Sequence, residues 1–197
     1  MTDEHSLIRR CRQQDEEAFE LLVGLKRGKV FRIALNIVGD EDDAKEITQL
    51  AFVRLWQSLG SFRESARFDP WFYRIVVNLS LDHWRRRRKR PDAPRPGDSR
   101  DVDSMDPASP PGPMGSEQDA AMHRADIRRV FNEAALGLTP QQRAAFTLRE
   151  IEGLSTDDVA KALGVRASTV RNHLMQARRT LQEFLRRRYP ELFRPKG

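Results

Sequence analysis

The sequence predicts an all-α protein built from two small helical domains. Val and Ile recur at helical spacings, and no alternating apolar run bounded by tight turns appears. A chain of 197 residues is long enough for one medium domain or two small ones. Residues 91–120 hold seven of the eleven prolines and too little apolar surface to offset the entropy of ordering. We therefore expect a flexible acidic linker at 91–120, between a domain at 1–90 and a helix-turn-helix domain at 121–197.

The charge of the chain is divided into blocks that match these boundaries. Residues 1–90 carry a formal charge of +4, residues 91–120 carry −5 and residues 121–197 carry +7, which gives the net charge of +6. Two basic blocks separated by an acidic one indicate two separate contacts on one long polyanion.

Composition and spacing argue against several classes of protein. Cys11 is the only cysteine, which excludes an intramolecular disulfide and a multi-cysteine zinc site and favours a reducing, cytoplasmic location. No apolar run reaches about 18 residues, so we expect no membrane insertion. The four histidines lie on different expected helices, and no glycine-rich phosphate loop follows a strand. We expect no enzymatic site, no metal and no cofactor.

Two helices are expected in the first half of the N-terminal domain. Asp15 begins the first helix and Gly39 ends it, and the acidic cluster at 40–43 favours the positive N-terminus of the second. The second helix has an apolar stripe with Ala44 and Leu55 and, opposite it, a polar face that its core does not need. From the residues alone a solvated face is the simpler interpretation. The polar face consists of Asp43, Glu46, Gln49 and Gln57.

A polar loop with two aromatic residues follows Gly60. Phe62 and Phe68 stand beside Arg63 and Arg67, an arrangement that either belongs to the core or stacks on unpaired bases. A helix is expected to begin at about Trp71.

Basic side chains continue this third helix to its end. Arg74, Asn78 and Arg85 share one face, and six consecutive basic residues occupy 85–90 before Pro91 ends the helix. A nuclear localisation signal is the minor alternative, because these residues already form the end of an amphipathic helix.

The C-terminal domain carries the strongest pattern in the chain. Helices are expected at 121–136, from 139 to 153, from 155 to 164, and at 167–188. Ala160, Gly164 and Val170 have the small residue, turn glycine and apolar anchor of a helix-turn-helix, at offsets of four and six. An ordinary antiparallel helix pair is the alternative.

Side chains directed outward from the last helix are suited to reading DNA. Arg pairs with guanine, Asn with adenine and an apolar side chain with the thymine methyl group. The candidate contacts are Arg166, Ser168, Thr169, Arg171, Asn172, Met175, Arg178 and Arg179, the last of which either contacts phosphate or stays solvated.

Three segments together resemble the extracytoplasmic-function (ECF) group of bacterial RNA polymerase sigma factors. DAKEITQLAFVRLWQSL resembles the family's polymerase-binding helix, and FRESARFDPWFYRIVVNLSLDHWRRRRKR its −10 loop and helix. LTPQQRAAFTLREIEGLSTDDVAKALGVRASTVRNHLMQARRTL is similar to its −35-binding domain.

The resemblance implies a non-enzymatic initiation factor that binds core RNA polymerase and promoter DNA, double-stranded at −35 and melted at −10, under control of an anti-sigma factor. It assigns the polar face of the second helix to the coiled coil of the largest polymerase subunit, and the loop 61–69 to a base flipped from the −10 strand. It implies a linker that passes through the polymerase toward the RNA exit channel. The −10 contacts it implies are Phe62, Arg63, Arg67, Phe68, Arg74, Asn78, Arg85 and Arg86.

The sequence departs from the family pattern at a few positions. Lys45 and Leu50 stand where acids are frequent, and Val77 replaces a commonly polar or basic residue. His173 and Gln176 replace frequent arginines. The alternatives are a stand-alone helix-turn-helix regulator, which leaves the pattern at 43–90 unused, and a nucleic-acid-processing enzyme, which lacks a converging site.

Overall fold

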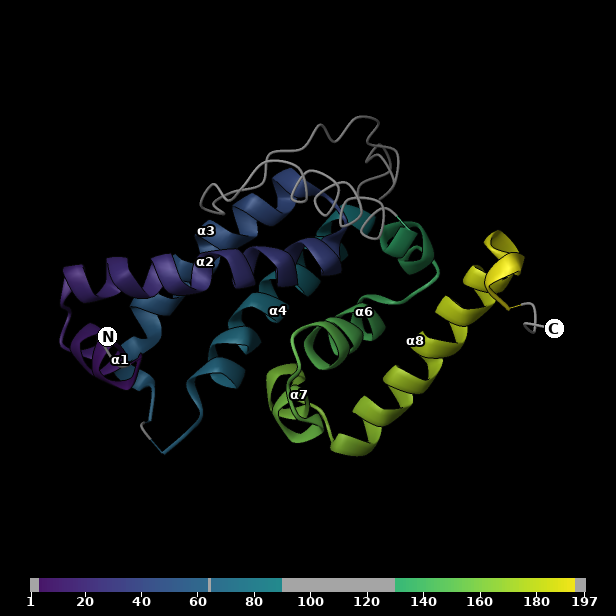
Figure 1. Cartoon of the computed structure of the whole chain (residues 1–197). Coiled ribbons are helices and arrows are strands. Elements are labelled where there is room, and N and C mark those ends of the chain that lie inside the picture. Colours follow the sequence, from purple (N-terminus) through teal and green to yellow (C-terminus); the bar gives the residue numbers. More distant parts are fainter. Residues whose placement is uncertain (1–3, 64, 90–129, 194–197) are drawn as a thin grey trace, which may run out of the picture.

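The computed structural model describes residues 4–63, 65–89 and 130–193, and all regular structure in these ranges is helical. The prediction of an all-α chain with two helical domains is confirmed. Residues 130–135 are helical as well, and short single turns occupy Leu59–Ser61, Thr147–Ile151 and Pro190–Phe193. The longer helices are α1 (Glu4–Arg12), α2 (Glu16–Val38), α3 (Glu41–Ser58), α4 (Phe68–Arg88), α6 (Pro140–Phe146), α7 (Thr156–Leu163) and α8 (Ala167–Arg188) (Figure 1).

Local capping chemistry sets the ends of α2 and α3, as predicted. The Asp15 carboxylate accepts a hydrogen bond from the backbone N–H of Ala18 at 3.0 Å and begins α2. Gly39 ends α2 in the left-handed conformation with φ of 78°. Asp40 then caps α3 by accepting from the N–H of Asp43 at 3.0 Å.

Helix α1 was not predicted from the sequence, and it completes the N-terminal bundle. Leu7, Ile8 and Cys11 are buried where α1 packs on α2. The buried ammonium of Lys26 connects three helices, because it lies 2.9 Å from Oε1 of Glu4 in α1 and 2.7 Å from Oδ1 of Asp69 in α4. α1 therefore fixes the start of α4.

Helix α4 begins at Phe68, three residues earlier than the expected start at Trp71. Pro70 lies in its first turn, where a missing backbone N–H costs no intrahelical bond. Phe68 and Phe62 are both buried and pack edge to face with ring centroids 5.5 Å apart. Phe62 and Phe68 therefore belong mainly to the hydrophobic core, and only a small part of each ring is left to contact an unpaired base.

The C-terminal helices form the predicted helix-turn-helix. Thr139 and Gln142 form a reciprocal capping box at the start of α6, and the Ser155 hydroxyl accepts from the N–H of Asp158 at the start of α7. Gly164 ends α7 with φ of 66°, and Val170 of α8 is fully buried. The small residue, turn glycine and apolar anchor thus take the places expected of them.

The two domains pack directly against each other. α4 lies along α7, and α2 contacts α6 (Figure 1). One hydrophobic cluster runs through both domains: Phe72, Tyr73 and Val77 of α4 belong to it together with Val159 and Leu174. In this conformation the larger cluster is shared by both domains, and a smaller one, with Ala135, Leu138 and Ala177, lies within the C-terminal domain.

The predicted flexible linker at 91–120 and the first part of the helix expected at 121–136 lie outside the described residues. Arg90, the last of the six basic residues, lies outside them too, while α4 carries the first four as far as Arg88. Across the described ranges, none of the helices combines the length and the apolar character needed to cross a bilayer.

Replacing Gly164 with alanine should destabilise the fold, whereas Gly24→Ala should stabilise it. Gly164 has φ of 66°, a conformation that costs an L residue about 1–2 kcal/mol. Gly24 lies inside α2, where an added Cβ meets nothing within 4 Å and helix propensity favours alanine by about 1 kcal/mol. Urea unfolding of the two variants measures both effects, and equal midpoints would contradict this account.

Candidate polymerase and promoter interfaces

The outward face of α8 presents the predicted −35 contacts together in a shallow groove. Its lining includes Arg171, Asn172 and Met175, with a volume of about 630 Å³. The sequence analysis missed Arg149 and Thr156, which also line the groove from outside α8. Arg178 and Arg179 line the groove as well. The remaining predicted contacts lie exposed or half-exposed at the start of the helix: Arg166, Ser168 and Thr169.

Ion pairs hold two of these arginines only loosely. Arg178 lies 2.7 Å from Glu150, and Arg179 lies 2.9 Å from Glu183. Three of the four side chains are more than half exposed and Glu150 is about one-third exposed. Such pairs contribute little to stability, so phosphate can replace the carboxylates at small cost. Partial burial lowers the pKa of His173, so its imidazole adds no positive charge to this face at neutral pH.

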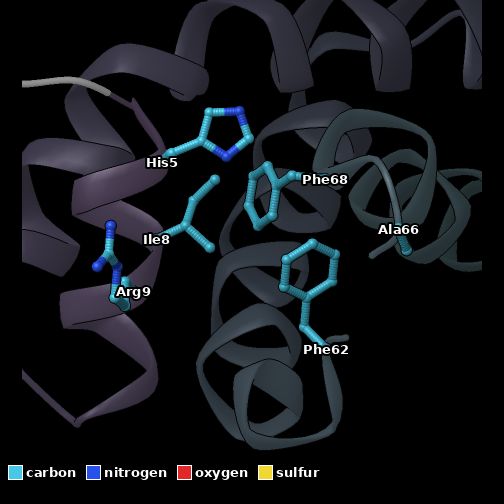
Figure 2. A pocket seen from close by; sticks show the side chains of 6 residues that line it. All are labelled: His5, Ile8, Arg9, Phe62, Ala66 and Phe68. Atoms are coloured by element: carbon cyan, nitrogen blue, oxygen red, sulfur yellow. The ribbon is translucent and has the colours of Figure 1, made fainter. Parts of the chain in front are cut away.

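A small cavity lies at the predicted base-capturing loop. It has a volume of about 160 Å³ and is bounded on one side by Phe62, Ala66 and Phe68 (Figure 2). The opposite side of the cavity is formed by three residues of α1: His5, Ile8 and Arg9 (Figure 2). These residues were not predicted, because α1 itself was not predicted. Because Phe62 and Phe68 are largely buried, only the small exposed part of each ring faces this cavity.

The other predicted −10 contacts are spread along the loop and α4. Arg63, Asn78 and Arg86 are exposed, and Arg85 is exposed and pairs with Asp82 at 2.8 Å. Two of the predicted contacts lie beside the C-terminal domain, although both side chains stay exposed. Arg67 forms an ion pair with Asp158 of α7. Arg74 lies beside the helix-turn-helix, since a Cβ at Gly164 would be 3.9 Å from its guanidinium.

The predicted polymerase-binding face of α3 also contains two exposed apolar residues: Leu50, noted from the sequence only as a departure from the family pattern, and Val53, which was not predicted. Leu50 is 43% exposed and Val53 is 53% exposed. Positions 43, 46, 50, 53 and 57 follow one another at intervals of three and four, so these two residues share a stripe with the predicted polar ones. Glu46, Gln49 and Gln57 are exposed.

Asp43, the fourth predicted residue of this face, is already engaged within the chain. Its carboxylate lies 3.0 Å from Nε2 of His83 and forms an ion pair with Arg87, both in α4. Asp43 therefore ties α3 to the basic end of α4, and only part of its side chain is exposed.

Two family models match the regions that hold these surfaces. Residues 22–90 match Sigma-70 region 2, and residues 128–181 match Sigma-70, region 4. The RNA polymerase sigma-H factor of Pseudomonas aeruginosa is 31% identical over 186 residues, which cover 92% of this chain and 93% of that protein. The ECF RNA polymerase sigma-E factor of Haemophilus influenzae is 28% identical, over 92% of this chain and 94% of its own.

The chain belongs to the ECF group of RNA polymerase sigma factors. An ECF sigma factor binds core RNA polymerase and directs it to promoter DNA for the initiation of transcription. The match to region 2 spans most of α2 and all of α3 and α4, and the match to region 4 spans α6, α7 and α8 as far as residue 181.

Solved structures agree with this assignment at the level of the fold. CnrH in complex with the cytosolic domain of CnrY has a TM-score of 0.67 at 21% identity, covering 92% of this chain and 96% of that one. The sigma factor RpoE in complex with the anti-sigma factor NepR from Bartonella quintana has a TM-score of 0.61 at 24% identity, covering 85% of this chain and 96% of its own.

Proposed function

We propose that three surfaces of this ECF sigma factor divide the work of initiation. The exposed stripe of α3 docks on core polymerase, the loop before α4 and the face of α4 hold the melted −10 element, and α8 reads the −35 element in the major groove. The helix-turn-helix supports this proposal most strongly, because its outward face brings Arg171, Asn172 and Met175 together in one groove. The proposed domain boundaries are 1–90 for the polymerase-binding and −10 domain, 91–120 for the linker and 121–197 for the −35 domain.

The polymerase surface combines charge and apolar area in one stripe. Glu46, Gln49 and Gln57 supply polar groups, while Leu50 and Val53 supply area that gains free energy when water is displaced. Leu50 stands where an acid is frequent in the family, so this factor places more of the interface energy in apolar contact. Asp43 contributes from its place against His83 and Arg87.

The −10 surface combines a cavity with cationic side chains. An unpaired base entering the cavity of about 160 Å³ would meet Phe62 and Phe68 on one side and the cationic Arg9 on the other. Arg63, Arg67, Arg74, Asn78, Arg85 and Arg86 would hold the neighbouring strand through its phosphates and base edges.

The factor is proposed to act in the cytoplasm, without catalytic activity of its own, under the control of an anti-sigma factor. Support for such a partner comes from the solved relatives of the same fold, one of which is an RpoE sigma factor bound to the anti-sigma factor NepR. DNA opening is then done jointly with the polymerase.

Run-off transcription tests the proposal as a whole. Bacterial core polymerase is incubated with a library of genomic fragments, with and without this chain. New start sites that depend on the chain are expected, together with co-purification of the chain with core. A stand-alone helix-turn-helix regulator would bind fragments yet give neither result.

Arg171→Ala should weaken recognition at a single base position of the −35 element. A bidentate contact to guanine contributes about 1–3 kcal/mol of discrimination, which is about a 5- to 150-fold loss of affinity. Binding to promoter fragments changed at one base each measures the effect. Equal weakening on every fragment would make Arg171 a phosphate contact instead.

A further inference from the structure

A single buried ammonium group links the two walls of the cavity at the loop before α4. The side chain of Lys26 in α2 is only 9% exposed, and its Nζ lies 2.9 Å from Oε1 of Glu4 and 2.7 Å from Oδ1 of Asp69. Glu4 directly precedes His5, which lies on one wall of the cavity (Figure 2). Asp69 directly follows Phe68, which lies on the opposite wall (Figure 2). The same Nζ lies 5.9 Å from the centre of the Phe68 ring, so Lys26 is linked to both walls.

The wall formed by α1 depends on this link. His5 and Arg9 share one face of the helix, because they are four residues apart, and both are exposed. The buried residues of α1 begin at Leu7, after the turn that contains Glu4. A helix of nine residues is too short to keep its first turn formed by itself, so the ion pair with Lys26 fixes where this turn lies.

The buried ion pairs of Lys26 contribute direction more than stability. Moving an ammonium group out of water is costly, and its attraction to carboxylates offsets that cost only when the geometry is good. Burial lowers the pKa of Lys26, but its hydrogen bonds to Asp69 and Glu4 raise it above its ordinary value, so the group is charged at neutral pH. A methionine would fill a similar volume without that cost. A methionine cannot, however, hold two carboxylates at hydrogen-bond distance from one atom.

We infer that Lys26 is a positioning residue for base capture, which holds the α1 wall of the cavity in register with Phe68. Lys26 does not touch the base itself, since its ammonium group is buried and already paired. Its effect is to keep the cavity in one shape before DNA binds, which removes part of the ordering cost of binding. This role rests on the proposed function of the cavity as the site of an unpaired −10 base.

Lys26→Met tests this role in the holoenzyme, assembled from bacterial core polymerase and the full chain. The holoenzyme is bound to a fluorescein-labelled promoter fragment from the run-off screen whose −10 non-template strand is single-stranded. An abasic site is placed at each −10 position in turn, and the position where wild-type affinity falls most marks the captured base. The affinity for the intact strand divided by the affinity for that abasic strand is the capture ratio.

The capture ratio should fall in the Lys26→Met variant. It should be about fivefold or more in the wild type, the lower end of what stacking of a base on an aromatic side chain contributes, and about twofold or less in the variant. Without the ammonium group, the carboxylates of Glu4 and Asp69 repel each other and the walls separate. A purely structural role of Lys26 would lower the affinity for both strands alike and leave the capture ratio unchanged.

Lys45→Met is the matched control. Lys45 also lies between two carboxylates, with its Nζ 2.9 Å from Glu41 and 3.4 Å from Asp42. Its side chain is 56% exposed on α3, however, and it does not line the cavity. Lys45→Met should therefore keep the wild-type capture ratio.

Glu4→Ala keeps the test valid if Lys26→Met fails to fold. Glu4 is 44% exposed, and its removal leaves the ion pair of Lys26 with Asp69 intact. The start of α4 then stays in place while the α1 wall loses its link, so the capture ratio should fall in this variant as well.

Two results would overturn the inference. Wild-type capture ratios in both Lys26→Met and Glu4→Ala would show that the ammonium group does not position the walls. An equal fall in Lys45→Met would show that the loss of any lysine charge is sufficient. If no abasic site lowers the affinity of the wild-type holoenzyme, the proposed base cavity itself is wrong, so the two failures are distinguishable.

Discussion

Leu50→Asp is expected to lower the affinity of the factor for core RNA polymerase by about a hundredfold. Leu50 is exposed in the free chain, and burying a leucine side chain in an interface contributes about 1.5–3 kcal/mol. The variant loses that gain and must also desolvate a carboxylate, which places the change among interface hot spots of 2 kcal/mol or more. Biolayer interferometry with immobilised core polymerase measures the dissociation constant.

Met175→Asp is the matched control for this substitution. Met175 is 61% exposed on α8, in the groove proposed for −35 DNA, and it undergoes a similar change from apolar to acidic. It should retain core binding and lose promoter affinity, whereas Leu50→Asp should lose core binding first. Wild-type affinity of Leu50→Asp for core would show that the α3 stripe is not the docking surface.

The features of the fold that could be predicted from the sequence are those set by residues that lie close together along the chain. Asp15, Gly39, Ser155 and Gly164 each act on a helix end within a few positions, so their residue types indicate the boundary directly. The same holds for the helix-turn-helix, whose offsets of four and six fall within one short segment. Such signals do not require knowledge of the rest of the chain.

The parts that were missed depend on contacts between distant segments. α1 is nine residues long, too short to be stable alone, and it exists because Leu7, Ile8 and Cys11 pack on α2. The contact of Glu152 with Lys29 joins two charged residues whose local sequence fits solvated helix surfaces equally well. Periodicity contains no information about such pairs.

The candidate sites were predicted in outline and missed in detail for a different reason. Val53 was left out of the polymerase face, and Leu50 was noted only as a departure from the family pattern, because only polar residues were selected as contacts. Their positions on the stripe that includes 43, 46 and 57 could have been found from spacing alone. The opposite wall of the cavity beside Phe62 could not, because it depends on α1.

Tyr73→Phe is expected to protect the protein against alkaline unfolding. Burial raises the pKa of Tyr73 far above its ordinary value of 10.0, and the nearby carboxylates of Asp69 and Glu152 raise it further. The unfolded chain ionises this phenol from about pH 10, while the folded chain keeps it neutral. The stabilisation is thus fully present below pH 10, and above it the wild type loses about 1.4 kcal/mol per pH unit.

A comparison of Tyr73→Phe with wild type separates the stability lost through ionisation of Tyr73 from the other effects of high pH on stability. The Tyr73 hydroxyl is buried without a hydrogen-bond partner among the described residues, so its removal should cost little stability at pH 7. Burial lowers the pKa of Lys26, but its hydrogen bonds to Asp69 and Glu4 and the charges of these two acids together raise it above its ordinary value. The stabilising pairs of Lys26 are also lost at high pH. That contribution is present in both proteins and cancels in the difference between them.

Urea unfolding at a series of pH values measures the effect. The free energy of unfolding of Tyr73→Phe minus that of wild type should be constant up to about pH 9.5 and then rise, reaching about 2 kcal/mol near pH 11.5. Tyr189→Phe, at the C-terminal end of α8, makes the same change at the only other tyrosine, whose ring is partly exposed, and is the control. Since Tyr73 belongs to the cluster shared by both domains, a flat difference at Tyr73 would mean that water reaches its hydroxyl and that α4 and α7 are not packed together in solution.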